Sequence, residues 1–129
     1  MFLSLDFLYA PAPDFEATLR YYTGVVGAEL FWKVRAMGTV VASLRLAEDG
    51  PELLLAEHLA GGGPILVYRV ASYRAAVDRL RAAGVTGGEE LEIPHGPCFA
   101  FEGPGGQRLA VYELVRPEVA AHFAGRVDP

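Results

Sequence analysis

The chain is poor in the residues that several common classes of protein depend on. Its 129 residues include one cysteine, Cys98, which excludes an internal disulfide and any cysteine-based zinc cluster. Basic residues number 11 against 16 acidic ones, for a net charge of −5, and they form no run or stripe. Nothing in the sequence could neutralise the phosphates of a nucleic acid, so we expect no nucleic-acid partner.

Long apolar runs are absent as well. Residues 1–11 (MFLSLDFLYAP) are apolar, but the segment is short, has no basic start and alternates as a strand does. It therefore predicts neither a signal peptide nor a membrane span, and a cytoplasmic location is the default expectation. Apolar residues still make up 52% of the chain and charged residues only 21%. This surplus predicts a deep pocket, a subunit interface or both.

The pattern of predicted strands and helices occurs twice along the chain. Asp14 and Ser72, 58 residues apart, each suit the start of a helix that follows one strand and precedes three more. The first half comprises strand 2–9, a helix from Asp14 that Gly24 and Gly27 end, and strands 29–35, 39–46 and 52–57. The second comprises strand 65–70, a helix from Ser72 to Gly84, and strands at about 89–93, 98–102 and 107–114.

Such a duplication predicts one α+β domain over residues 1–129. Its two βαβββ modules, at about 1–60 and 64–115, would bury their sheet faces together. Residues 116–125 lie outside the repeat and suit a short helix with an apolar stripe that includes Phe123. That helix either packs back on the sheet or makes a subunit contact.

Two motifs carry a resemblance to a known family. Gly103–Glu113, GPGGQRLAVYE, resembles the last hairpin of the vicinal oxygen chelate superfamily, which includes the glyoxalases, bleomycin-resistance proteins and extradiol dioxygenases. The usual form of that hairpin is D-P-x-G-N-x-[IL]-E-[LIF]-x-E. The segment from Asp14 to Gly27 resembles the D-x3-S-x2-F-Y-x3-L-G segment of the same family. The resemblance covers residues 3–115 and implies two modules forming a curled mixed sheet around a central cleft.

The resemblance also locates the family's metal ligands, which are His, Gln and Glu side chains from four strands. The matching positions here are Phe7, Leu54, Ile65 and Ala110. None of these side chains offers a lone pair to a cation, so we expect no metal and no other cofactor. A one-residue slip could bring Asp6 into the first position, and a slip in the fourth strand could bring in Glu57 or His58. Neither slip supplies a donor at Ile65 or Ala110.

Without the metal, these four residues would form the apolar floor of a ligand-binding cleft. Strand parity places further side chains on the same faces, and Trp32 could close one end. The predicted ligand-binding residues are Phe7, Tyr9, Trp32, Leu54, Ile65, Arg69, Arg108, Ala110 and Tyr112. Arg69 or Arg108 could pair with a ligand carboxylate, or each could be an ordinary solvated or ion-paired surface residue.

Three reactive side chains remain. His95, between two prolines and a glycine, is either a general acid/base or a histidine hydrogen-bonded to the backbone at a strand end. Cys98 lies in an apolar strand and is predicted to be a buried core thiol. Glu113 matches a family residue that does not bind metal, and we expect it to close a hydrogen bond to a neighbouring strand or helix end.

The resemblance therefore implies a small-molecule binding or sequestering protein, a homodimer that takes an apolar or aromatic ligand without the usual metal site. The alternative is a metal-dependent lyase, isomerase or dioxygenase of the same superfamily with a displaced ligand set. That set would come from Asp6, His58, His95 and Glu113. A third interpretation, a domain that acts by protein–protein contact, depends only on the terminal helix.

Overall fold

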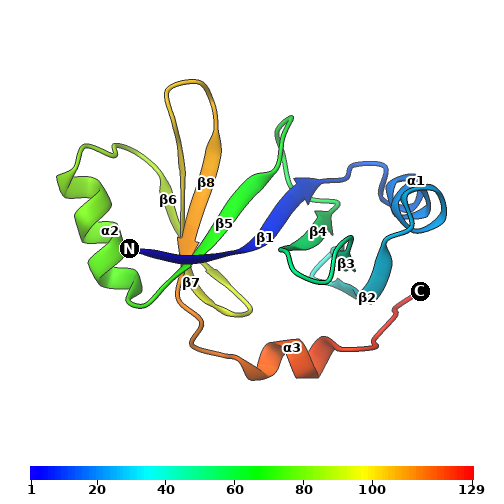
Figure 1. Cartoon of the computed structure of the whole chain (residues 1–129). Helices are drawn as coiled ribbons and strands as arrows, with labels where there is room; N and C mark the ends of the chain where they lie inside the picture. Colours follow the sequence, from blue (N-terminus) through cyan, green and yellow to red (C-terminus); the bar gives the residue numbers. More distant parts are fainter.

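The computed structural model describes residues 1–129 and places all eight strands in one curled sheet (Figure 1). The strands run in the order β2-β3-β4-β1-β5-β8-β7-β6. Their bounds are β1 (Phe2–Pro11), β2 (Glu29–Ala36), β3 (Thr39–Arg45), β4 (Glu52–Ala56), β5 (Ile65–Val70), β6 (Glu89–Ile93), β7 (Gly96–Glu102) and β8 (Arg108–Tyr112). The predicted α+β fold of two βαβββ modules is confirmed.

The two modules are built alike and meet at the centre of the sheet. In the first, β1 pairs in parallel with β4, and in the second, β5 pairs in parallel with β8. The two halves are joined by the antiparallel pairing of β1 with β5. Because each module contributes four strands on one side of this seam, the sheet can curl about it and present one continuous inner face.

Two helices cover the outer face, one for each module. Helix α1 (Phe15–Arg20) buries Phe15 and Leu19 against β3 and β4, and helix α2 (Tyr73–Ala82) buries Val77 against β7 and β8. Ser72 caps α2 as predicted, since its side chain accepts a hydrogen bond from the Ala75 amide.

The start and the end of the first helix differ from the prediction. The Asp14 side chain makes no capping hydrogen bond, and its backbone carbonyl instead accepts from the amide and hydroxyl of Thr18. Gly24 does not end the helix, which continues as a π-helical turn, η1 (Tyr21–Val26). The chain leaves it at Gly27, whose φ of 87° is the left-handed conformation that favours glycine.

A third helix and the chain end cover the inner face. Helix α3 (Glu118–Phe123) runs beneath the curled sheet from the second module towards β2, as Figure 1 shows. Phe123 packs against the inner-face core, so the first of the two alternatives for this helix is confirmed. The tail then pairs with the edge of β2, where the Lys33 amide donates to the Arg126 carbonyl and the Asp128 amide donates to the Lys33 carbonyl. None of the helices has the length and apolar character that a bilayer crossing requires.

Two strands are irregular where they cross the inner face. The pairing of β1 with β5 shifts between Leu5 and Phe7, and that of β2 with β3 shifts between Leu30 and Trp32. The extra residues are Asp6 and Phe31. Because a bulge interrupts the strict alternation of side chains, it can turn an additional side chain towards the inner face.

A substitution at Gly96, at the start of β7, can test how tightly this residue packs against the backbone of Glu113. A Cβ atom on Gly96 would lie 2.0 Å from the Glu113 carbonyl oxygen, so we expect Gly96→Ala to lower the free energy of unfolding by about 1–3 kcal/mol. Gly24→Ala is the matched control, because no atom lies within 4 Å of its added methyl group and alanine favours helix. Urea denaturation that gave both variants the same stability would contradict this packing.

Candidate functional site

The inner face of the sheet is the candidate site, and its centre is packed with hydrocarbon. Phe7, Leu54, Ile65 and Ala110, the four predicted floor residues, all belong to or pack against one cluster. Phe7 and Ala110 are joined through Val67, which pairs with both, and Tyr9 pairs with Leu54 on one side and Ile65 on the other. The structure therefore brings these residues together as one packed cluster.

A group of four polar side chains, Ser4, Asp6, Arg69 and Tyr112, lies at the edge of this core. The bulge turns Asp6 inward, where its carboxylate accepts hydrogen bonds from the Tyr112 hydroxyl and from Ser4 Oγ, the latter at 2.6 Å. Arg69 Nε lies 3.5 Å from the same carboxylate and has no hydrogen-bond partner although it is buried. Burial and the bond to Asp6 raise the pKa of Tyr112, so the phenol remains a neutral donor.

Arg108 lies at the other end of its strand, away from this group. Its guanidinium donates to the carbonyls of Ala60, at 2.6 Å, and of Gly63. These hydrogen bonds hold the glycine linker between the modules, residues 61–63, against the start of β8. Arg108 is therefore occupied by the backbone and does not face the core around Phe7.

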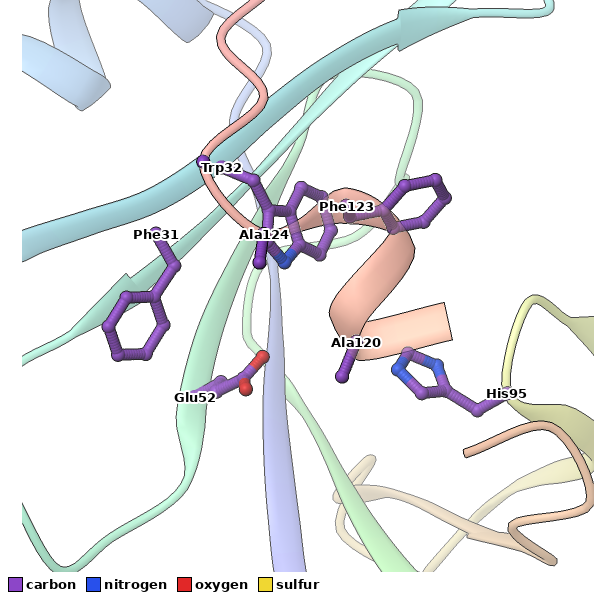
Figure 2. A pocket seen from close by; sticks show the side chains of 8 residues that line it. Phe31, Trp32, Glu52, His95, Ala120, Phe123 and Ala124 are labelled. Carbon is purple, nitrogen blue, oxygen red and sulfur yellow. The ribbon is translucent and has the colours of Figure 1, made fainter. Parts of the chain in front are cut away.

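A pocket of about 170 Å³ lies between α3 and the sheet. Figure 2 shows its aromatic walls, in which the rings of Trp32 and Phe123 have centroids 5.1 Å apart. The Glu52 carboxylate and the His95 imidazole point into the space from opposite sides (Figure 2). The lining residues are Phe31, Trp32, Glu52, His95, Ala120, Phe123, Ala124 and Gly125.

His95 occupies a two-residue turn between β6 and β7. Its ring packs against Phe7 at 4.8 Å and against Tyr112 at 6.1 Å between centroids, and it makes no side-chain hydrogen bond. The backbone carbonyl of His95, rather than its ring, accepts from the amides of Val115 and Arg116. Burial lowers the pKa of His95, although the charge of Asp6 opposes the shift, so the ring is neutral near pH 7.

Cys98 and Glu113 have the structural roles that the sequence predicted. Cys98 is buried in the inner-face core, and burial raises the pKa of its thiol to about 12, which leaves it unreactive. Glu113 accepts a hydrogen bond of 2.8 Å from the amide of Tyr73, the first residue of α2. A carboxylate at a helix N-terminus is stabilising because it meets unpaired amides.

A family model described as the Glyoxalase/Bleomycin resistance protein/Dioxygenase superfamily matches residues 4–111. The chain belongs to this superfamily. No protein of curated function matches the chain in sequence.

Solved structures of the superfamily share this fold at low sequence identity. Methylmalonyl-CoA epimerase from Mycobacterium tuberculosis is 20% identical, with a TM-score of 0.70 over 93% of each chain. Hypothetical protein BH1468 from Bacillus halodurans is 16% identical, with a TM-score of 0.70 over 85% of this chain and 93% of that one. A catechol 2,3-dioxygenase is 16% identical, with a TM-score of 0.62 over 87% of this chain and 40% of that one. At these identities the likeness establishes the fold and leaves the activity open.

The divalent metal that the superfamily implies does not fit the residues present. The four positions matched to the family's ligands are carbon, and no group of three or more His, Cys, Asp or Glu side chains is arranged to hold a metal. The displaced set fails for the same reason. Glu113 is bound to α2, and the exposed His58 pairs through Nδ1 with Thr39 Oγ1 at 2.9 Å. No chemical step is therefore assigned to a metal.

Sequence reasoning missed two lining residues that the sheet contributes, Glu52 and Phe31. It also did not assign to a site the four that the last helix and its end contribute, Ala120, Phe123, Ala124 and Gly125. Glu52 lies two residues before Leu54 in β4, so strand parity alone would have placed it on the inner face. Phe31 precedes Trp32 and would point outward in a regular strand. Only the bulge brings it inward, and nothing in the local sequence marks that bulge.

The half-buried His95 ring predicts a specific loss of stability in acid. A histidine with a lowered folded-state pKa contributes stability that is complete above its ordinary pKa of about 6.5 and is lost as the pH falls through the folded value. We expect His95→Gln to lose less unfolding free energy than the wild type between pH 7 and pH 5. Urea titrations at each pH measure the difference, with the exposed His122→Gln as control. Parallel profiles for the wild type and His95→Gln would contradict the burial of this ring.

Proposed function

We propose that the protein binds or sequesters a small apolar or aromatic molecule in the pocket between the sheet and α3, without a divalent metal. The observation that carries the proposal is the aromatic pocket of about 170 Å³ walled by Phe31, Trp32 and Phe123. Apolar walls with a few converging polar groups are typical of small-molecule sites. Glu52 and His95 are the polar groups here.

The pocket volume limits the size of the ligand. An apolar cavity of about 150 Å³ in another protein holds benzene, whereas sites for drug-sized molecules span roughly 300–1,000 Å³. The pocket therefore suits a compound with one ring or a short aliphatic chain. A larger ligand requires α3 to move away from the sheet.

Binding is favoured over metal-dependent chemistry by the arrangement of side chains. Methylmalonyl-CoA epimerase and catechol 2,3-dioxygenase show that the fold includes enzymes. In this chain the centre of the corresponding inner face is hydrocarbon, Asp6 at its edge is already bound to Tyr112 and Ser4, and Glu52 accepts a hydrogen bond from Ser43. The displaced-metal alternative therefore has no support from the side chains.

Ligand binding can be followed through Trp32, the only tryptophan of the chain. We expect single-ring aromatic compounds to change its fluorescence and to raise the melting temperature. Ala120→Phe should abolish both effects by filling the pocket, since Ala120 lines it. Ala121→Phe, at an exposed neighbour outside the lining, should leave them intact. A broad aromatic panel that neither shifts the fluorescence nor raises the melting temperature would remove the proposal's support.

The proposal includes a homodimer in the cytoplasm. Several large apolar side chains are exposed, among them Phe2, Leu3, Val25 and Met37, and such surface is commonly covered by a subunit contact. We expect light scattering to give twice the chain mass of 13.9 kDa. A monomer mass at micromolar concentration would refute the dimer while leaving the binding proposal standing.

A further inference from the structure

The charge of the pocket is carried by Glu52, which has no cation to balance it. Its carboxylate Oε2 accepts a hydrogen bond of 2.9 Å from Ser43 Oγ, and Ser43 is completely buried. No Lys, Arg or His nitrogen lies within the 4.0 Å of an ion pair. Glu52 is half-buried, and the Ser43 hydrogen bond fixes its carboxylate without neutralising the charge. A ligand that covers this carboxylate removes it from water, which costs free energy unless the ligand brings a positive charge.

The aromatic walls favour a positive charge in the same space. Ring faces carry partial negative charge and attract ammonium and guanidinium groups. The protein already shows this at one wall, where the Arg45 guanidinium carbon lies 4.3 Å from the centroid of the Phe31 ring. Arg45 is not among the residues that line the pocket, so the interior space beside Trp32 and Phe123 holds no protein cation.

The arginines that could have attracted an anionic ligand are engaged elsewhere. Arg69 lies against the Asp6 carboxylate, and Arg108 donates to the linker carbonyls of Ala60 and Gly63. Neither lines the pocket. Arg69 and Arg108 were each a candidate to pair with a ligand carboxylate, and the contacts of both residues argue against that role.

His95 completes the arrangement from the opposite side of the pocket (Figure 2). Its ring makes no hydrogen bond within the protein and is neutral near pH 7 because burial opposes its protonation. A neutral imidazole does not repel a cation, and its unprotonated nitrogen can accept a hydrogen bond. Glu52 and His95 therefore give the pocket two acceptors for the N–H groups of one ligand.

We infer that the ligand of this pocket is a small organic cation, a protonated amine that carries one ring or a short apolar chain. Glu52 would bind the ammonium group, and the apolar part would lie between Trp32 and Phe123. This inference rests on the proposed function and specifies the ligand class of the same site. The pocket volume of about 170 Å³ restricts the class to compounds of one ring.

Three ligands of similar size can separate the effect of ligand charge on affinity from the effect of the aromatic ring. Phenethylamine, 2-phenylethanol and phenylacetate differ chiefly in carrying a positive charge, no charge and a negative charge. We expect calorimetry and Trp32 fluorescence at neutral pH and low salt to rank phenethylamine about tenfold tighter than 2-phenylethanol, a difference of ~1.4 kcal/mol. Phenylacetate should bind most weakly. This ranking uses the wild-type protein and does not depend on whether a variant folds.

A matched pair of variants assigns the preference to Glu52. Glu52→Gln should weaken phenethylamine binding about tenfold and change 2-phenylethanol binding less than about twofold, because it removes the charge and keeps the shape. Glu48→Gln makes the same change in net charge at an exposed turn and should preserve the wild-type ranking.

The binding results for these ligands and variants distinguish a failure of the cation assignment from a failure of the proposed binding function. If phenylacetate or 2-phenylethanol binds as tightly as phenethylamine, or if Glu52→Gln keeps the preference, the cation assignment is wrong and the binding function stands. If none of the three ligands and no member of the aromatic panel binds, both proposals fail.

Discussion

The contact between Phe123 and Trp32 is the interaction on which the site depends. It joins the last helix to β2, and the tail beyond it adds backbone hydrogen bonds between Lys33 and residues 126 and 128. An aromatic pair of this kind contributes about 0.5–1.5 kcal/mol beyond the area it buries. Without this closure, the inner face of β2 would be open to solvent and the pocket would lose one of its walls. The pocket is thus formed by an element that lies outside the duplicated modules.

The second constraint on the site is the apolar character of the side chains at the centre of the inner face. A divalent ion needs several lone pairs at fixed positions, and the chain has Phe7, Leu54, Ile65 and Ala110 there. Hydrocarbon at these positions packs into a core cluster with Trp32, Val67, Cys98 and Tyr112. The free space and the unpaired charge are displaced to the rim, where β4, the β6–β7 turn and α3 converge. The pocket therefore lies beside the positions that match the superfamily's metal ligands.

Much of the fold could be predicted because it depends on local signals. The helix start at Ser72 and the strand at 65–70 follow from capping and periodicity, and the duplication orders them. The pocket could not be predicted in the same way. It needs the bulge at Phe31, which is set by the pairing of β2 with β3, and the return of Phe123 to Trp32, about 90 residues earlier in the chain. Parity fails at a bulge, so Phe31 could not be assigned to the inner face, whereas Glu52 shares the parity of Leu54 and was overlooked.

The most direct test is a crystal structure of the protein grown with phenethylamine and a divalent metal together. We expect the ammonium nitrogen at about 3 Å from the Glu52 carboxylate, the ring between Trp32 and Phe123, and no metal on the inner face. An ordered metal ion held there by side chains from both modules, with the amine absent from the pocket under α3, would contradict it.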